Sequence, residues 1–326
     1  WRVLNVEREK GYFRSGMIQG IAVFSLTLLF VALIPVIGPI VVIMTPLPIL
    51  YHYSRLGRLK GLAAMAVALA AVYVILGLLN QRVNPFILST IGLTGVILAE
   101  ILRWRLSIEK TFLLASLALF FGGVGFIAYF ALRTGASPWS VLELYVAGII
   151  RENLKLYEQL NVSPDQVALV RENSRGIAEF ITGIFPALAF SGAMITVWLN
   201  VLAGRLLFRG KGGPIPDFGD LATWKAPERL VWVLIVSGTA VLAPWEPLDV
   251  IGLNILILCC LVYFFQGLSI ATFFFRVKRI PLVMRALFYL LILVQQYMVV
   301  FVIALGLFDI WVDFRKRIKG ITDVHA

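Results

Sequence analysis

The apolar stretch from Met17 to Tyr53 constrains the fold of this chain most, because prolines interrupt it. Pro35, Pro39 and Pro46 stand inside or beside runs of hydrophobic residues. A proline ring inside a helix clashes with the preceding turn and removes one amide donor, so one straight helix over the whole stretch is excluded. The stretch therefore predicts two membrane passes, joined by the uncharged turn from Ile34 to Pro39.

Basic residues flank this predicted hairpin on both sides, with Arg8 and Arg14 before it and Arg55 and Lys60 after it. Short loops that are rich in Lys and Arg face the cytoplasm. The flanks therefore predict a cytoplasmic N-terminus. The same rule predicts a cytoplasmic side for the segments 55–60, 103–110, 205–229 and 276–285.

The composition is that of a membrane protein that crosses the bilayer several times, since 60% of the 326 residues are hydrophobic and 14% are charged. The net charge of +11 comes from basic residues beside the ends of apolar segments, which excludes nucleic acid as a partner and favours the lipid bilayer. Cys259 and Cys260 are adjacent within an apolar run, so neither a disulfide nor a metal site is expected. Without a set of nucleophile, base and carboxylate, the chain is expected to use no cofactor and not to be an enzyme.

The apolar runs predict an all-α bundle of nine membrane segments, with eight true spans as the alternative. Residues 1–204 form a predicted six-span unit, residues 205–229 a cytoplasmic loop, and residues 230–326 three further segments with a basic tail. The last run, Val283 to Leu307, should end outside, yet Arg315 and Lys316 follow it, and a basic tail prefers the cytoplasm. Either the tail departs from the rule, or one of the shorter segments is re-entrant.

The outer helical segment, residues 137–176, is the long polar region of the predicted six-span unit. Ser137 and Ser163 each precede a proline, which predicts two capped helix starts. The first helix, Pro138 to Leu160, has an apolar side and a charged side, so an amphipathic helix on the outer surface is expected. Its charged side comprises Glu143, Arg151, Glu152, Lys155 and Glu158.

Alanines at four-residue spacing predict a helix-packing interface within Gly61 to Leu79. Such spacing places small side chains on one helix face, where a second helix can approach closely. The pairs are Ala64 with Ala68 and Ala66 with Ala70. The partner helix belongs either to the same bundle or to another subunit, in a homo-oligomer or in a complex with a partner membrane protein.

Neutral polar residues and glycines inside apolar runs are the predicted ligand contacts. Gln266 lies on one late segment, and Gln295 and Gln296 lie on the next. Their amides are costly in hydrocarbon unless they are paired, so they either join helices or line a substrate cavity. Gly122 and Gly123 interrupt another segment and leave room for a neighbouring helix or a ligand. These five residues are therefore predicted ligand-binding positions, with tight helix packing as the alternative.

The chain resembles the YybS family of bacterial membrane proteins at three short motifs. The first runs from Pro46 to Ile49 and on through Tyr53, Ser54, Arg55, Leu56, Gly57, Lys60 and Gly61. The second runs from Trp224 to Trp232 and the third from Gly306 to Arg315. The resemblance implies a multi-pass membrane protein of uncharacterised function, located in the bacterial cytoplasmic (inner) membrane.

The predicted six-span unit is also similar to the substrate-capture subunits of energy-coupling-factor vitamin transporters and to the rod-shape protein MreD. Those capture subunits carry an Ala-x-x-x-Ala docking motif in their first helix, whereas here this spacing occurs in Gly61 to Leu79. The three segments after the sixth are a further departure from that pattern. Fold similarity alone does not define function.

Two functional classes follow from the sequence. Helix breaks, mid-segment glycines and amides favour a solute-binding or transport-related subunit, whose site is expected inside the six-span unit, near Pro35, Gly38 and Pro39. The alternative is a membrane scaffold or assembly protein that organises partner subunits, which the alanine face favours.

Overall fold

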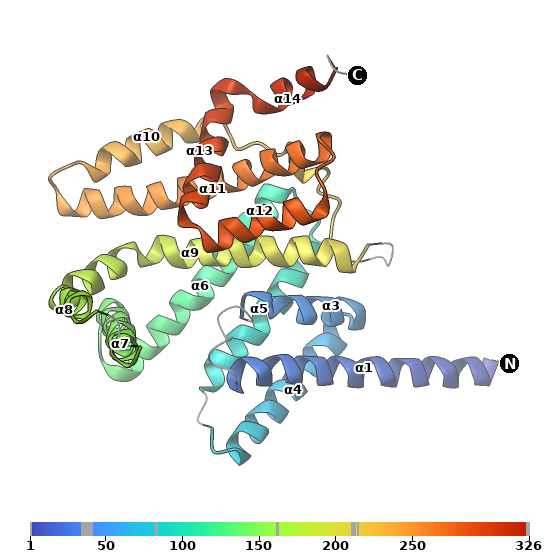
Figure 1. The fold of residues 1–326 in the computed structure, drawn as a ribbon. Helices are drawn as coiled ribbons and strands as arrows, with labels where there is room; N and C mark the ends of the chain where they lie inside the picture. The colour runs from blue at the N-terminus through green and yellow to red at the C-terminus, as the bar shows by residue number, and fades with distance from the viewer. Residues whose placement is uncertain are drawn as a thin grey trace. The chain divides into compact units, whose positions relative to one another are not determined.

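The computed structural model describes residues 2–33, 42–81, 84–160, 163–209, 213 and 215–323, and the regular elements in these ranges are helices (Figure 1). The chain divides into a first compact unit, Trp1–Asn153 with Gly192–Asp217, and a second, Leu154–Ser191 with Phe218–Ala326. The predicted organisation into 1–204, 205–229 and 230–326 concerns membrane topology and stays a prediction. The turn from Ile34 to Pro39 lies outside the described residues.

An all-α architecture with several membrane helices is confirmed in the described part of the chain. Five helices are long and apolar enough to cross a membrane: Gly16–Leu33, Arg58–Leu78, Ile108–Thr134, Ser174–Leu207 and Pro247–Val277. By the same criteria of length and composition, the count among the described residues rises to six if the bent pair α12 (Leu282–Val294) and α13 (Gln296–Val312) forms one span. Nine membrane segments are therefore not confirmed.

Short helices account for part of this lower count. Helix α3 (Pro46–Leu56) has 11 residues and α10 (Leu230–Val241) has 12. Crossing the hydrocarbon core takes about 20 helical residues. The predicted second pass of the opening hairpin is thus represented by a helix too short to cross by itself, which Gly57, with a φ of 82°, separates from the next helix.

The first unit is built from helices that follow one another closely in the chain. Its helices are α1 (Arg2–Leu33), α3, α4 (Arg58–Leu78), α5 (Pro85–Arg103) and α6 (Ile108–Thr134), together with parts of α7 (Pro138–Gln159) and α9 (Ser174–Leu207). Helix α4 packs against α1, α3 and α5, and α5 packs against α6. Asn84 caps α5, because its side chain accepts a hydrogen bond from the amide of Phe86 at 2.9 Å.

The two alanine pairs on α4 lie on different sides of the helix. Ala64 and Ala68 are fully buried, on the side that also carries the buried residues Val72 and Leu76. Ala66 and Ala70 are exposed. The first pair therefore packs inside the first unit, and the second pair is the part of the predicted interface that another molecule or lipid can reach.

Helix α7 has the predicted bounds within one residue, and its charged residues Arg151, Glu152 and Lys155 are exposed. The amide of Ser140 donates to Ser137 Oγ at 3.0 Å, which confirms the first predicted cap. The second predicted cap, at Ser163, is only partly right. Ser163 occupies the N-cap position of α8 (Pro164–Glu172), but its side chain makes no capping hydrogen bond. Backbone geometry alone starts that helix.

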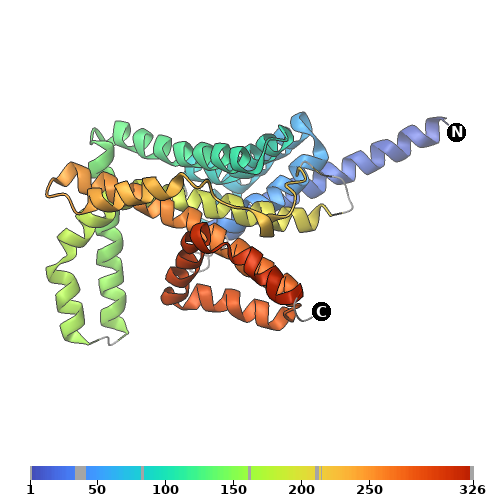
Figure 2. The same ribbon diagram turned by 90° about the horizontal axis from the view of Figure 1, so that it is seen from above.

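The second unit is organised around α11 (Glu246–Val277). Helices α10 and α13, the 3₁₀ turn η1 (Leu221–Thr223) and α14 (Phe314–Asp323) all pack against it. Figure 2 shows α10 lying along the first part of α11. Gly252 allows this approach, since an added Cβ there would lie 2.9 Å from the carbonyl oxygen of Ser237.

Asn254 on α11 joins the part of α9 that belongs to the second unit. Pro186 lies inside α9, where a proline weakens the helical hydrogen-bond ladder. The Asn254 amide accepts from the backbone N–H of Ala187 at 2.9 Å and donates to the carbonyl of Gly183 at 2.8 Å. This amide therefore satisfies two backbone groups beside the proline and connects two helices.

Candidate functional site

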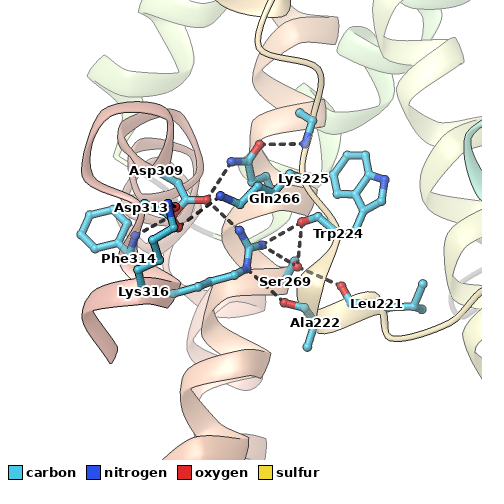
Figure 3. Close-up of polar contacts among 12 residues, drawn as sticks. Leu221, Ala222, Trp224, Lys225, Gln266, Ser269, Asp309, Asp313, Phe314 and Lys316 are labelled. Atoms are coloured by element: carbon cyan, nitrogen blue, oxygen red, sulfur yellow. Dashed lines mark hydrogen bonds and ion pairs between the residues drawn. The ribbon is translucent and has the colours of Figure 1, made fainter. Parts of the chain in front are cut away.

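A buried ion pair between Asp309 and Arg315 is the centre of the most extensive polar cluster in the described part of the second unit (Figure 3). Arg315 Nη1 lies 2.7 Å from Asp309 Oδ2, and the two side chains are 8% and 0% exposed. Charged groups at this depth require both a counter-charge and further hydrogen bonds. The surrounding residues supply these bonds, and we call the cluster the Asp309–Arg315 centre.

The junction between α13 and α14 places both charges. Helix α13 ends at Asp313, which adopts a left-handed conformation with a φ of 45°, and α14 begins at Phe314. Asp309 Oδ1 accepts a hydrogen bond from the amide of Phe314 at 2.9 Å, so one carboxylate satisfies both the start of α14 and Arg315. The chain reversal at Asp313 therefore returns Arg315 to a carboxylate six residues earlier.

Helix α11 contributes Gln266 and Ser269, which are three residues apart and therefore share one helix face. Gln266 Nε2 donates to Asp309 Oδ2 at 3.1 Å, and Gln266 Oε1 accepts from the amide of Ala226 at 3.1 Å. Ser269 Oγ accepts from Arg315 Nη2 at 2.9 Å. Its hydroxyl hydrogen is within reach of the carbonyl oxygen of Leu221, at 2.9 Å.

The segment from Leu221 to Ala226 contributes backbone groups to the same centre. Arg315 Nη2 donates to the carbonyl of Trp224 at 2.8 Å, and Nε donates to the carbonyl of Ala222 at 3.2 Å. Asp220 caps η1 and pairs with Arg276 of α11 at 2.5 Å. The segment is thus attached to α11 at two points, through Arg276 and through the Asp309–Arg315 centre.

The electrostatics of the centre change from its buried core to its rim. Burial lowers the pKa of Arg315, and the neighbouring carboxylate of Asp309 opposes that shift. At the rim, the hydrogen bond from Lys316 lowers the pKa of Asp313, and Lys225 at 3.1 Å lowers it further. The pKa of Lys316 is raised by the same hydrogen bond.

The chemistry of the Asp309–Arg315 centre is that of a closed network. The donors of Arg315 and the acceptors of Asp309 and Gln266 are engaged by groups of the protein itself. The arrangement can hold α11, α13, α14 and the 221–226 segment together. It presents no open carboxylate or thiol, and no group of three His, Cys, Asp or Glu residues that could hold a metal occurs among the described residues.

The structure separates the predicted ligand-binding positions. Gln266 belongs to the Asp309–Arg315 centre, whereas Gln295 and Gln296 are exposed at the break between α12 and α13. Thirteen helical residues separate Gln296 from Asp309, or about 20 Å along α13, so these amides do not converge with Gln266. Gly122 and Gly123 are exposed in the middle of α6 in the first unit, with no atom within 4 Å of an added Cβ.

A smaller cluster in the first unit contains an ion pair between Glu100 and Arg103, three residues apart on α5, at 2.9 Å. The sequence did not indicate its other members. Tyr53 Oη donates to Glu100 Oε1 at 2.8 Å, and Arg58 contacts Glu100 Oε2 at 2.8 Å. The guanidinium of Arg103 also lies over the Tyr53 ring, 5.3 Å from its centroid. This cluster joins α3, α4 and α5.

Asp309 is the main residue that reasoning from the sequence missed. A carboxylate within an apolar helix is costly and marks either function or a buried partner, and Arg315 six residues later supplies that partner. The signal was therefore present, but the partner lies beyond the end of the helix. Only the reversal at Asp313 brings the two side chains together.

Residues of all three motifs that carry the family resemblance take part in the polar clusters of the structure. The middle motif supplies Trp224 and Ala226 to the Asp309–Arg315 centre, and the last motif supplies Asp309 and Arg315. The first motif supplies Tyr53 to the cluster around Glu100. Each motif therefore contributes residues to a polar cluster within one of the two units.

Comparisons with known proteins agree with this architecture. Residues 22–310 match the family model described as predicted membrane protein (DUF2232). The chain is 24% identical over 318 residues to the uncharacterised protein YybS of Bacillus subtilis (strain 168), covering 92% of this chain and 96% of that protein. No solved structure matches the chain. The chain is a member of the DUF2232 family of multi-pass membrane proteins, to which the three motifs and the apolar helices point.

Proposed function

We propose that this protein is a solute-binding or transport-related membrane subunit that performs no enzymatic chemistry, and that the corner between α12 and α13 contacts the solute. One observation carries the proposal: two apolar helices are bent by 109° at a break that presents Gln295 and Gln296 side by side in sequence. Both side chains are exposed.

The physical argument concerns backbone and amide groups inside a bilayer. Gln295 has extended backbone geometry, with φ −112° and ψ 107°, so the helical ladder is interrupted at this residue. Irregular backbone at membrane depth is tolerated where it is buried in protein or lines a water-filled cavity. Broken membrane helices of this kind form the binding sites of many transporters. The corner thus has hydrogen-bonding groups suited to a polar solute.

The proposal includes a topology in the bacterial inner membrane. The nine predicted segments correspond to α1, α3, α4, α5, α6, α9, α10, α11 and the α12–α13 pair. With a cytoplasmic N-terminus, the basic segments 55–60, 103–110, 205–229 and 276–285 then face the cytoplasm. Helix α7 covers the outer surface.

The test is purification without added ligand, followed by native mass spectrometry. The wild type is expected to retain a small molecule. Replacing Gln295 and Gln296 by Ala removes two amides, each contributing about 1 kcal/mol, so its occupancy should fall by roughly tenfold or more. Gln81→Ala, at an exposed amide in the first unit, is the matched control and should retain the molecule. An empty wild type, or equal occupancy in all three proteins, contradicts the proposal.

A membrane scaffold is the second function we consider, because of the exposed face of α6. Gly122, Gly123 and Gly125 have no atom within 4 Å of an added Cβ, so a helix of another subunit could approach closely there. In this case the same native spectra show a companion subunit or a homo-oligomer in place of a solute. Replacing Gly122 and Gly123 by Leu should then dissociate that assembly.

A further inference from the structure

The entry and exit of the α12–α13 pair lie near one end of α11. Helix α11 ends at Val277, and α12 begins at Leu282 after four residues. At the other end of the pair, Asp309 and Arg315 are bonded to Gln266 and Ser269, in the second half of α11. Figures 1 and 2 both draw α14 returning toward the side of the unit on which α12 begins.

The 221–226 segment belongs to the same end of α11. Asp220 contacts Arg276 at 2.5 and 3.0 Å, one residue before α11 ends. Lys225 contacts Asp313 at 3.1 Å, directly after α13. The loop before α10, the entry to α12 and the exit from α13 are therefore connected to one another by charged contacts. Charged contacts of this kind, partly exposed, belong at a membrane surface and not at opposite surfaces.

Neither of the two helices is long enough to cross the membrane by itself. The 13 residues of α12 rise about 20 Å and the 17 of α13 about 25 Å, each less than the hydrocarbon core of roughly 30 Å. The 109° bend then turns the chain back. At the corner, Leu293, Val294 and Tyr297 are 83%, 71% and 79% exposed, so the corner lies away from the packed interior of the unit.

Uncompensated basic residues flank both ends of the pair. Lys278 and Arg279 stand before α12, and Arg317 stands after α13, all exposed and without an ion pair within 4.0 Å among the described residues. The nearby carboxylates are already engaged, Asp220 by Arg276 and Asp313 by Lys225 and Lys316. The excess charge at this end of the unit is therefore positive.

We propose that α12–α13 is a re-entrant hairpin that enters and leaves the membrane on the side of the 221–226 segment, and that Lys278, Arg279 and Arg317 bind the anionic phospholipid headgroups of that leaflet. Exposed Lys and Arg beside the ends of apolar helices favour such headgroups. This arrangement also removes the conflict over the basic tail, because an in-and-out hairpin returns the tail to the side of the other basic loops. It does not require that the corner binds a solute.

Cysteine labelling tests the hairpin. Single cysteines replace Glu228, Lys278 and Lys316 in a Cys259→Ala, Cys260→Ala background, and a membrane-impermeant maleimide is applied to spheroplasts and to inverted vesicles. All three positions should react from the same side. If position 316 reacts from the side opposite to positions 228 and 278, the pair crosses the membrane once and the re-entrant proposal is wrong.

Lipid retention tests whether Lys278, Arg279 and Arg317 bind anionic headgroups. The protein is reconstituted in nanodiscs of phosphatidylglycerol and phosphatidylcholine, released into mild detergent, and its retained lipids are counted by native mass spectrometry. The Lys278→Gln, Arg317→Gln double variant should lose phosphatidylglycerol by about thirtyfold, since each of the two basic residues near the surface contributes on the order of 1 kcal/mol. The control variant Arg151→Gln, Lys155→Gln, on α7, should behave as the wild type. Unchanged phosphatidylglycerol retention in the first variant refutes the headgroup assignment, whatever the labelling shows.

Discussion

At the scale of single residues, Asp309 shows how a charge is accommodated inside this protein. Its carboxylate receives hydrogen bonds from Arg315, Gln266 and the amide of Phe314, which together replace the water it has lost. Such an ion pair is costly to bury. Removing one partner destabilises the protein more than replacing both, because the remaining charge is then buried without compensation. The stability of the second unit therefore depends on both members being present.

Replacing Asp309 by Asn should destabilise the protein by about 3 to 5 kcal/mol, because the guanidinium of Arg315 stays buried without its counter-charge. The measurement is the thermal unfolding midpoint of the purified protein in detergent. Asp217→Asn, at a side chain that is 91% exposed, is the matched control and should change the midpoint little. The double variant Asp309→Leu, Arg315→Leu should lose less stability than Asp309→Asn. Equal midpoints for Asp309→Asn and the wild type would refute this account.

Asp313 predicts a pH dependence with a defined sign. Its pKa is lowered by the hydrogen bond from Lys316 and by Lys225, so the folded state binds a proton less readily than the unfolded state. Its contribution is then fully present above the unfolded pKa of about 3.9 and is lost as the pH falls through the lower folded value. Asp313→Asn should therefore lower the unfolding midpoint at pH 7, and the difference from the wild type should shrink below about pH 4. A difference that grows on acidification contradicts this assignment.

At the scale of elements, the crossing of α11 and α13 rests on two glycines. A Cβ added to Gly267 would clash with the carbonyl oxygen of Val302, and one added to Gly306 would clash with the carbonyl oxygen of Tyr263. The backbone of each helix therefore lies against the backbone of the other, as in closely packed membrane helix pairs. Because carbonyl oxygens cannot move aside as a flexible side chain can, this crossing admits no larger residue.

Gly267→Ala and Gly306→Ala should each destabilise the second unit by about 1 to 3 kcal/mol or more, through overpacking. Gly122→Ala is the control within a membrane helix, since its added Cβ meets nothing within 4 Å. It should be neutral or slightly stabilising, because Ala is favoured over Gly in a helix by roughly 1 kcal/mol. Thermal unfolding in detergent and the yield of monodisperse protein report the effect. If all three variants unfold at the same temperature, the close crossing is not present in solution.

At the scale of the whole molecule, each compact unit has its own polar cluster and its own tightly packed helices. The first unit uses Tyr53, Glu100 and the arginines around them, and the second uses the Asp309–Arg315 centre. Since α7 and α9 contribute residues to both units, each unit contains segments that are distant in the sequence. The proposed solute contact and the proposed re-entrant hairpin both belong to the second unit, and the glycine face of α6 belongs to the first.

Local chemistry explains which features can be predicted from the sequence. Apolar runs with charged ends identify membrane helices, Asn84 and Ser137 identify helix starts, and Glu100 with Arg103 identifies an ion pair, because each signal is contained within a few residues. Four-residue spacing likewise identifies a face of α4. It does not distinguish Ala64 and Ala68, which are buried, from Ala66 and Ala70, which are exposed.

By itself, the sequence determined that this protein is an all-α membrane protein of several helices, since hydrophobicity and charge are properties of the chain alone. Only the tertiary structure decided where Asp309 finds Arg315 and how α12 meets α13. No proline or glycine marks the break at Gln295, and the reversal at Asp313 occurs in a residue other than glycine. Both are bends that local preferences do not dictate. The turn at Asp313 forms because contacts with α11 and the 221–226 segment, distant in sequence, stabilise it once the helices have packed.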